Sequence, residues 1–352
     1  MSQYLSKKYQ SLEAYTPGEQ PRDMRYVKLN TNESPYPPAP GVVEAVQREA
    51  ARAQLYSDPV CTDLRDALAA RYGVKRENVF VSNGSDDILN FAFMAFAGCS
   101  VPACFPDISY GFYPVYAALH GIEAKIVPLR EDFSIDPADY MNLDGFIAIA
   151  NPNAPTGMAL TRAQIEAILK SNPGHVVLID EAYVDFGAES CVPLVETYDN
   201  LLVVQTYSKS RSLAGARLGF AIAQPGLIAD LERIKYSTNP YSVNRMTLVA
   251  GVASLAADDY NADNCRRVMA TRERTVARLE AMGFEVLPSQ ANFVFARKPG
   301  TDGNALYLEL KKRGVLVRHF TAPRIADFLR ITIGTDAEME VLFAKLNEIL
   351  ED

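Results

Sequence analysis

Three apolar runs decide the fold: GFIAIANPNAPTG at residues 145–157, VVLIDEAY at 176–183 and LLVVQTYSKS at 201–210. Each run ends in polar or turn-forming residues, as buried strands do. Similar runs occur as VFVSNG at 79–84, VPACFP at 101–106, AKIVPL at 124–129 and RLGFAIA at 217–223, and most are separated by stretches of helical spacing. Continuous apolar runs predict strands covered on both faces. We therefore expect an α/β fold, with a three-layer large domain built on a mainly parallel sheet with right-handed crossovers.

The chain divides into three predicted parts. Residues 1–38 are rich in Pro, Tyr and Asn and predict an extended arm that drapes over a partner surface, whereas residues 39–239 form the large domain. After TNPYSVN the sequence pattern changes to that of two helical segments, short strands and a last helix. This pattern predicts a smaller C-terminal α+β domain over residues 240–352.

Composition excludes several classes of protein. With 352 residues, of which 48% are hydrophobic and 22% charged, the chain has the balance of a folded globular protein. The net charge of −8 argues against a broad nucleic-acid surface, so any basic site must be local. Five scattered cysteines favour reduced thiols, and three widely separated histidines form no local metal motif. No signal peptide or membrane span is evident, so we expect a cytoplasmic protein without metal, nucleic-acid or membrane partners.

Polar residues directly after the apolar runs are the candidate functional residues, because ligands of open parallel sheets bind beyond the carboxyl ends of the strands. Residues 83–86 either cap a helix or bind an anion there, or do both. Asp180 either caps the next segment or pairs with a cation. Lys209 is either a solvated loop lysine or a desolvated amine, and Arg217 either holds a phosphate or forms a salt bridge. A cofactor with one phosphate and one ring cation, such as pyridoxal phosphate, would use all of them.

Motifs along nearly the whole chain carry a resemblance to a known family. They are YTPG at 15–18, LNTNESPYPP at 29–38, NPNAPTG at 151–157, LIDEAYVDF at 178–186, TYSKSRSLAGARLGF at 206–220, ANFVF at 291–295, VRHF at 317–320 and FLRITIGT at 328–335. In order and spacing the chain resembles the fold-type-I pyridoxal-phosphate aminotransferases, and among them the histidinol-phosphate aminotransferases. The resemblance implies amino transfer from histidinol phosphate to 2-oxoglutarate in histidine biosynthesis, with pyridoxal 5′-phosphate as cofactor. Threonine-phosphate decarboxylase and an aromatic amino-acid aminotransferase are alternatives, because the same motifs fit them; a non-enzymatic binding protein would have no use for Lys209.

The resemblance also implies roles for the residues around the cofactor. Lys209 bonds to it covalently and moves the substrate proton, Asp180 keeps its pyridine nitrogen protonated, and Tyr183 donates to its ring hydroxyl, so these three are the candidate catalytic residues. Tyr110 stacks on the ring. The cofactor phosphate is held by Ser85, Asp86, Ser208, Ser210 and Arg217.

Two further implications concern Tyr56 and position 154. Tyr56 in QLYSDP resembles the tyrosine that such enzymes lend to the phosphate site of a neighbouring subunit, which implies an obligate homodimer. Members of the family that the chain resembles usually have Asn before the Pro-Thr-Gly of this turn, whereas this chain has Ala154. The ring hydroxyl would then be bound by Tyr183 alone, by a water or by Asn153.

At the substrate end, the resemblance implies two cations and a closing arm. Two arginines suit a dianion, although each could instead form a surface salt bridge. Glu33 is a candidate to meet an imidazole, or else a solvated loop acid. The predicted substrate-binding residues are Arg330, Arg318, Tyr15, Asn32 and Glu33.

Overall fold

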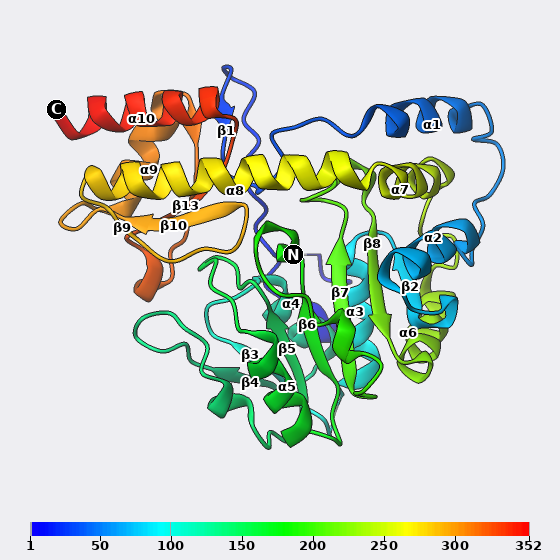
Figure 1. Ribbon diagram of the computed structural model, residues 1–352. Coiled ribbons are helices and arrows are strands. Elements are labelled where there is room, and N and C mark those ends of the chain that lie inside the picture. Colours follow the sequence, from blue (N-terminus) through cyan, green and yellow to red (C-terminus); the bar gives the residue numbers. More distant parts are fainter. Residues whose placement is uncertain (1, 99, 352) are drawn as a thin grey trace.

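The computed structural model describes residues 2–98 and 100–351, which form a large seven-stranded sheet, a smaller four-stranded sheet and a two-stranded sheet (Figure 1). The large sheet has the order β2-β8-β7-β6-β5-β3-β4. Neighbouring strands are parallel from β4 through β7, and β8 runs antiparallel to both of its neighbours, so the sheet is mainly parallel, as predicted. Its strands are β2 (Val79–Ser82), β3 (Ala103–Pro106), β4 (Ala124–Val127), β5 (Phe146–Ala150), β6 (Val177–Asp180), β7 (Leu201–Thr206) and β8 (Gly219–Ala223).

Helices cover both faces of this sheet because its central strands are apolar on both faces. In β5, Ile147 and Ile149 enter one hydrophobic cluster, and the intervening Ala148 enters the other. The first cluster includes residues of α1 (Pro40–Ala50), α2 (Thr62–Tyr72), α5 (Arg162–Ser171) and α7 (Arg245–Ala256). The second includes residues of α3 (Ser85–Phe96), α4 (Phe112–His120) and α6 (Pro225–Thr238). The predicted three layers are thereby confirmed.

The smaller unit is built on an antiparallel sheet of order β12-β13-β10-β9. Its strands are β9 (Glu285–Val286), β10 (Phe293–Arg297), β12 (Arg318–His319) and β13 (Phe328–Thr332). Its helices are α8 (Asp258–Ala281), α9 (Gly303–Lys312) and α10 (Asp336–Glu351). The long α8 runs from beside α7 across the small sheet (Figure 1). Because α7 packs on α1 and α2, it lies with the large unit although it follows the boundary predicted at residue 239; the division into domains stays a prediction.

The arm is attached to the small unit. Its strand β1 (Val27–Lys28) pairs in parallel with β11 (Val315–Leu316), and Leu29 is buried in the core of the small unit. Short 3₁₀ helices complete the described structure at Lys7–Tyr9, Arg76–Asn78, Pro137–Tyr140, Val184–Phe186, Val192–Leu194, Ala214–Ala216 and Pro323–Ile325.

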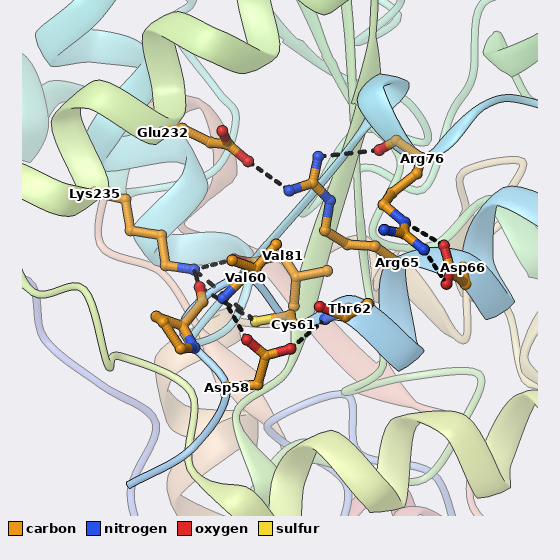
Figure 2. A network of polar contacts seen from close by, with 11 residues as sticks. Asp58, Val60, Cys61, Thr62, Arg65, Asp66, Arg76, Val81, Glu232 and Lys235 are labelled. Carbon is orange, nitrogen blue, oxygen red and sulfur yellow. Dashed lines mark hydrogen bonds and ion pairs between the residues drawn. The ribbon is translucent and has the colours of Figure 1, made fainter.

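A polar network, shown in Figure 2, fixes the loop that precedes α2. Lys235 of α6 is only 4% exposed, and its Nζ donates to the carbonyl oxygens of Pro59 at 3.0 Å and Val81 at 3.3 Å. Arg65 of α2 donates to Glu232 of α6 at 2.6 Å. Since a buried ammonium is costly to leave without acceptors, these bonds hold the loop against the sheet.

Candidate active site

Two adjoining cavities lie at the carboxyl ends of β6 and β7, an inner one of about 500 Å³ and an outer one of about 810 Å³. Both are lined by Gln20, Thr31, Tyr110, Ala154, Tyr183 and Lys209. Further predicted residues that line the inner cavity are Glu33, Ser85, Asp86, Asp180, Ser208 and Arg217. Those that line the outer cavity are Tyr15, Asn32, Arg318 and Arg330. The structure thus brings most of the predicted site residues together.

Asp180 is the last residue of β6 and is 5% exposed. Burial raises its pKa to about 7, even though hydrogen bonds from the Tyr113 hydroxyl and the Ala182 amide, each 3.2 Å long, favour the carboxylate. A cationic ligand group beside Asp180 would offset this desolvation. The inner cavity therefore offers a strong position for a protonated ring nitrogen.

Lys209 follows β7 and lines both cavities. Its Nζ donates to the carbonyl of Thr31 at 3.1 Å and lies 5.8 Å from the centroid of the Tyr183 ring. Burial, followed by the positive charge of Arg330, lowers the pKa of Lys209 to about 8. A lysine of this kind is partly neutral near physiological pH and can act as a nucleophile or base.

The N-terminus of α3 could hold an anion. The backbone N–H groups of Ser85 and Asp86 belong to the first turn, where the helix dipole favours negative charge. Arg217 donates to the Asp86 carboxylate at 2.6 Å. A Cβ on Gly219 would lie 2.3 Å from the Ser85 nitrogen, and one on Gly84 would lie 2.8 Å from Arg217. These glycines therefore allow the start of β8, the start of α3 and the loop of Arg217 to approach one another closely.

Two arginines lie side by side in the wall of the outer cavity. Arg318 of β12 and Arg330 of β13 are paired in register. Arg318 donates to the carbonyls of Thr16 and Pro17 in the arm, and Arg330 donates through Nη2 to the carbonyl of Asn30 at 3.0 Å. The buried Nε of Arg330 has no partner within the described residues, and burial lowers the pKa of this guanidinium. An anion bound here would satisfy both the free donor and the charge.

The family model for aminotransferase class I and II matches residues 25–346. The chain belongs to this family. A histidinol-phosphate aminotransferase of Marinomonas sp. (strain MWYL1) is 53% identical over 353 residues, covering 99% of this chain and 100% of the relative. One of Brachyspira hyodysenteriae is 48% identical over 354 residues, covering 100% of both. The crystal structure of histidinol-phosphate aminotransferase from Sinorhizobium meliloti in complex with pyridoxal-5′-phosphate superposes with a TM-score of 0.89 at 25% identity, covering 100% of this chain and 98% of that one.

In this aminotransferase, the position of Asn153 differs from the one that its predicted contact with the cofactor's ring hydroxyl requires. It lines neither cavity; its amide donates to the Ile108 carbonyl and the Thr156 hydroxyl, and its oxygen accepts from Ser109. The side chain is 1% exposed, so it stabilises its own turn. The asparagine that contacts Tyr183 is Asn32 and not Asn153: among the described residues, the Tyr183 hydroxyl accepts a hydrogen bond from Asn32 at 2.9 Å.

Of four other predicted residues, Ser210 and Glu33 lie in a different setting from the one expected, whereas Tyr110 and Tyr56 have settings compatible with their predicted roles. Ser210 lines neither cavity but a separate one beside Arg211 and Asp258. Glu33 lines the inner cavity and not the substrate end, and it is bonded to Lys28 and Thr31. The hydroxyl of Tyr110 donates to Asp86 at 2.6 Å, and Tyr56 is 80% exposed and stacks on Tyr241 with ring centroids 4.7 Å apart.

Sequence reasoning missed Thr206, Tyr113 and Thr31. Thr206 ends β7, lines the inner cavity and donates to the Ser208 hydroxyl at 3.0 Å, so its position at a strand end could have identified it. Tyr113 lies inside α4 and reaches Asp180 only through the tertiary fold, so no local pattern indicates its contact. Within residues 2–98 and 100–351, no cluster of three or more potential metal-ligating side chains is found, and no helix has the length and apolarity to cross a membrane.

Proposed function

We propose that the chain is a pyridoxal 5′-phosphate-dependent histidinol-phosphate aminotransferase that acts as a cytoplasmic homodimer and passes the amino group to 2-oxoglutarate. One observation carries this proposal: a desolvated lysine, a buried aspartate and a helix N-terminus with an arginine line one cavity, while two arginines line the adjoining cavity. The identity of about half of all residues with curated histidinol-phosphate aminotransferases over the full chain supports the substrate.

The residues of the inner cavity fit the cofactor. When bound, pyridoxal phosphate supplies an electron sink for negative charge that develops on a substrate carbon. Arg217 and the first N–H groups of α3 would hold its phosphate, and Asp180 would keep a proton on its pyridine nitrogen. Lys209 would hold its aldehyde carbon and, once released by substrate, would carry the proton to and from the substrate carbon.

The outer cavity suits both proposed substrates. A phosphate monoester and the distal carboxylate of a 2-oxo diacid are anions that a guanidinium pair binds with the same donors. Arg330 keeps its Nε free for such a ligand, while Arg318 ties the arm to the small unit. One pocket can therefore serve both half-reactions, with Tyr15, stacked on Phe112 at 4.2 Å between ring centroids, as part of its wall.

The homodimer proposal rests on the surface around Tyr56. The loop that bears Tyr56 is fixed by the network of Figure 2, yet large apolar side chains on it and beside Tyr56 are exposed, namely Leu55, Val60 and Tyr241 at 41–49%. A rigid apolar face of this kind fits a second copy of the chain, whose phosphate site the Tyr56 hydroxyl would reach. Tyr56→Phe keeps the stacking surface, so we expect a dimer in sedimentation velocity and about tenfold weaker cofactor binding. A monomeric wild-type protein would refute this part of the proposal.

Amino transfer is tested with purified, cofactor-loaded protein, histidinol phosphate and 2-oxoglutarate, with glutamate as the measured product. Threonine phosphate, with carbon dioxide as the readout, and phenylalanine are assayed in parallel. We expect glutamate only with histidinol phosphate, and loss of turnover in Lys209→Ala and in Lys209→Arg, which keeps the charge but not the nucleophilic amine. Turnover by Lys209→Ala at the wild-type rate would contradict the mechanism, and carbon dioxide release would identify a decarboxylase.

A further inference from the structure

Asn32 of the arm is bonded through all of its polar groups. It adopts a left-handed conformation with φ of 54° and is 1% exposed. Its backbone N–H donates to the Thr332 hydroxyl at 3.0 Å, and its backbone carbonyl accepts from Asn292 at 3.0 Å. Its side-chain oxygen accepts from Thr332 at 2.9 Å, and its side-chain nitrogen donates to the Tyr183 hydroxyl at 2.9 Å.

Thr332 sets the orientation of the Asn32 amide. Its hydroxyl accepts from the backbone N–H of Asn32, so its single proton is free for an acceptor, and the only acceptor atom on the Asn32 side chain is the amide oxygen. The amide nitrogen must therefore face Tyr183. A buried donor is costly to leave unpaired, so the Tyr183 oxygen is held as an acceptor.

The hydrogen-bond direction at Tyr183 leaves its own proton pointing away from Asn32. Its ring meets Phe293 edge-on, with centroids 5.1 Å apart, and packs against the apolar cluster of Ala154, Ala291 and Phe293, whose side chains offer no polar atom. Tyr183 lines both cavities, and within the described residues its hydroxyl donates to no acceptor. The phenol proton is thus free for a ligand oxygen in the cavity that holds Lys209.

We propose that Asn32 is a positioning residue that aims the Tyr183 phenol proton at the ring oxygen of bound pyridoxal phosphate. The inference rests on the proposed function and deepens it, because the cofactor carries a phenolic oxygen on its ring. A donor held toward that oxygen stabilises its anionic form. If the Tyr183 proton no longer pointed at that oxygen, the pH at which the visible absorbance of the bound cofactor changes would rise.

The test is a pH titration of that absorbance in cofactor-loaded protein. Asn32→Asp keeps the shape and the bond from Thr332 but replaces the donor by an acceptor, which turns the phenol proton away from the cofactor. Asn32→Gly tolerates the positive φ and removes the side chain. We expect the midpoint to rise by about one pH unit in Asn32→Asp and by less in Asn32→Gly, with a fall in kcat larger than the change in KM.

The same variants are also made in a Tyr183→Phe background, which lacks the phenol hydroxyl. In that background the charge introduced by Asn32→Asp can act on the cofactor only directly, so comparing the two backgrounds separates an effect through Tyr183 from a direct one. We expect each shift to shrink in that background to less than half of its size in the wild type. Ser34→Ala, in the same arm, controls for disturbance of the arm and should leave the midpoint unchanged.

Two results would overturn the inference. Unchanged midpoints with a lowered Tm would make Asn32 a purely structural residue, and equal shifts with and without the Tyr183 hydroxyl would mean that Asn32 does not act through it. The proposed function has a separate readout. A wild-type protein that acquires no visible absorbance with pyridoxal phosphate would overturn that function, and this inference with it.

Discussion

Replacing Asp180 with Asn should stabilise the cofactor-free protein while it abolishes amino transfer. Burial raises the pKa of Asp180 from 3.8 to about 7, so the folded state binds a proton that the unfolded state has released. This acid therefore destabilises the fold increasingly as pH rises from the unfolded to the folded pKa, and by a constant amount above it. The carboxylate is 5% exposed, so solvent screens it little.

The size of the effect follows from the two pKa values. Each unit corresponds to about 1.4 kcal/mol, which gives a destabilisation of about 2 kcal/mol at pH 5 and about 4 kcal/mol at pH 8. Asn can still accept from the Ala182 amide through its Oδ1 and can donate to the Tyr113 oxygen through its Nδ2, so the change in these two bonds adds only a contribution that is independent of pH. The difference in unfolding free energy between Asp180→Asn and the wild type should therefore grow by about 2 to 3 kcal/mol from pH 5 to pH 8 in favour of the variant.

Urea unfolding of cofactor-free protein at both pH values measures this change, and Asp327→Asn, at an exposed position, serves as the control with no expected change. In the loaded protein the order should reverse, because the wild-type carboxylate gains a cationic partner; pyridoxal phosphate should raise Tm more in the wild type than in Asp180→Asn. A stability difference that does not vary with pH would refute the reasoning about desolvation. Full amino transfer by Asp180→Asn would refute the assigned role.

Three further outcomes are expected. The rate at which cofactor-free protein captures pyridoxal phosphate should rise with pH and level off above about 8, because the neutral Lys209 amine is the nucleophile; stopped-flow absorbance measures it, and a rate independent of pH from 6 to 9 would contradict the lowered pKa. Arg217→Ala should weaken cofactor binding by about 10- to 100-fold, measured by fluorescence titration, with no change for Arg76→Ala, which pairs with Asp66 on the surface. Arg330→Lys should raise KM for both substrates by at least about tenfold, since an ammonium cannot replace a forked guanidinium; an effect on one substrate alone would mean that the substrates use different cations.

The large sheet could be predicted from sequence because its central strands are buried on both faces. Such strands read as unbroken apolar runs, and their order along the chain, alternating with helices, favours parallel pairing. The strands β1 and β11 carry no such signal, since each has two residues and they lie far apart in the chain. The predicted arm is thus tied into the small unit by a pairing that only the tertiary fold reveals.

Residues of the site could be predicted from sequence where they lie at or just after the end of a strand. Asp180 ends a buried strand and Lys209 closely follows another, so their position marks them without knowledge of their neighbours. The direction of a side chain inside a turn has no such marker. Asn153 and Asn32 are both buried asparagines next to the site, and only their hydrogen-bond partners show that the first supports a turn and the second reaches Tyr183.

The charges of the two cavities explain how an acidic protein can bind anions. The whole chain has a net charge of −8, yet the acids near the site are largely compensated: Asp86 is paired with Arg217, Glu33 with Lys28, and Asp107 with Arg324. Asp180 has a pKa near 7 and is therefore only partly ionised at neutral pH. The adjacent cations at the outer end, Arg318 and Arg330, have backbone carbonyls as their described hydrogen-bond acceptors, and carbonyls leave the full positive charge in place. Because this charge is partly buried, salt screens it weakly, so a doubly charged ligand gains more there than a neutral amine does.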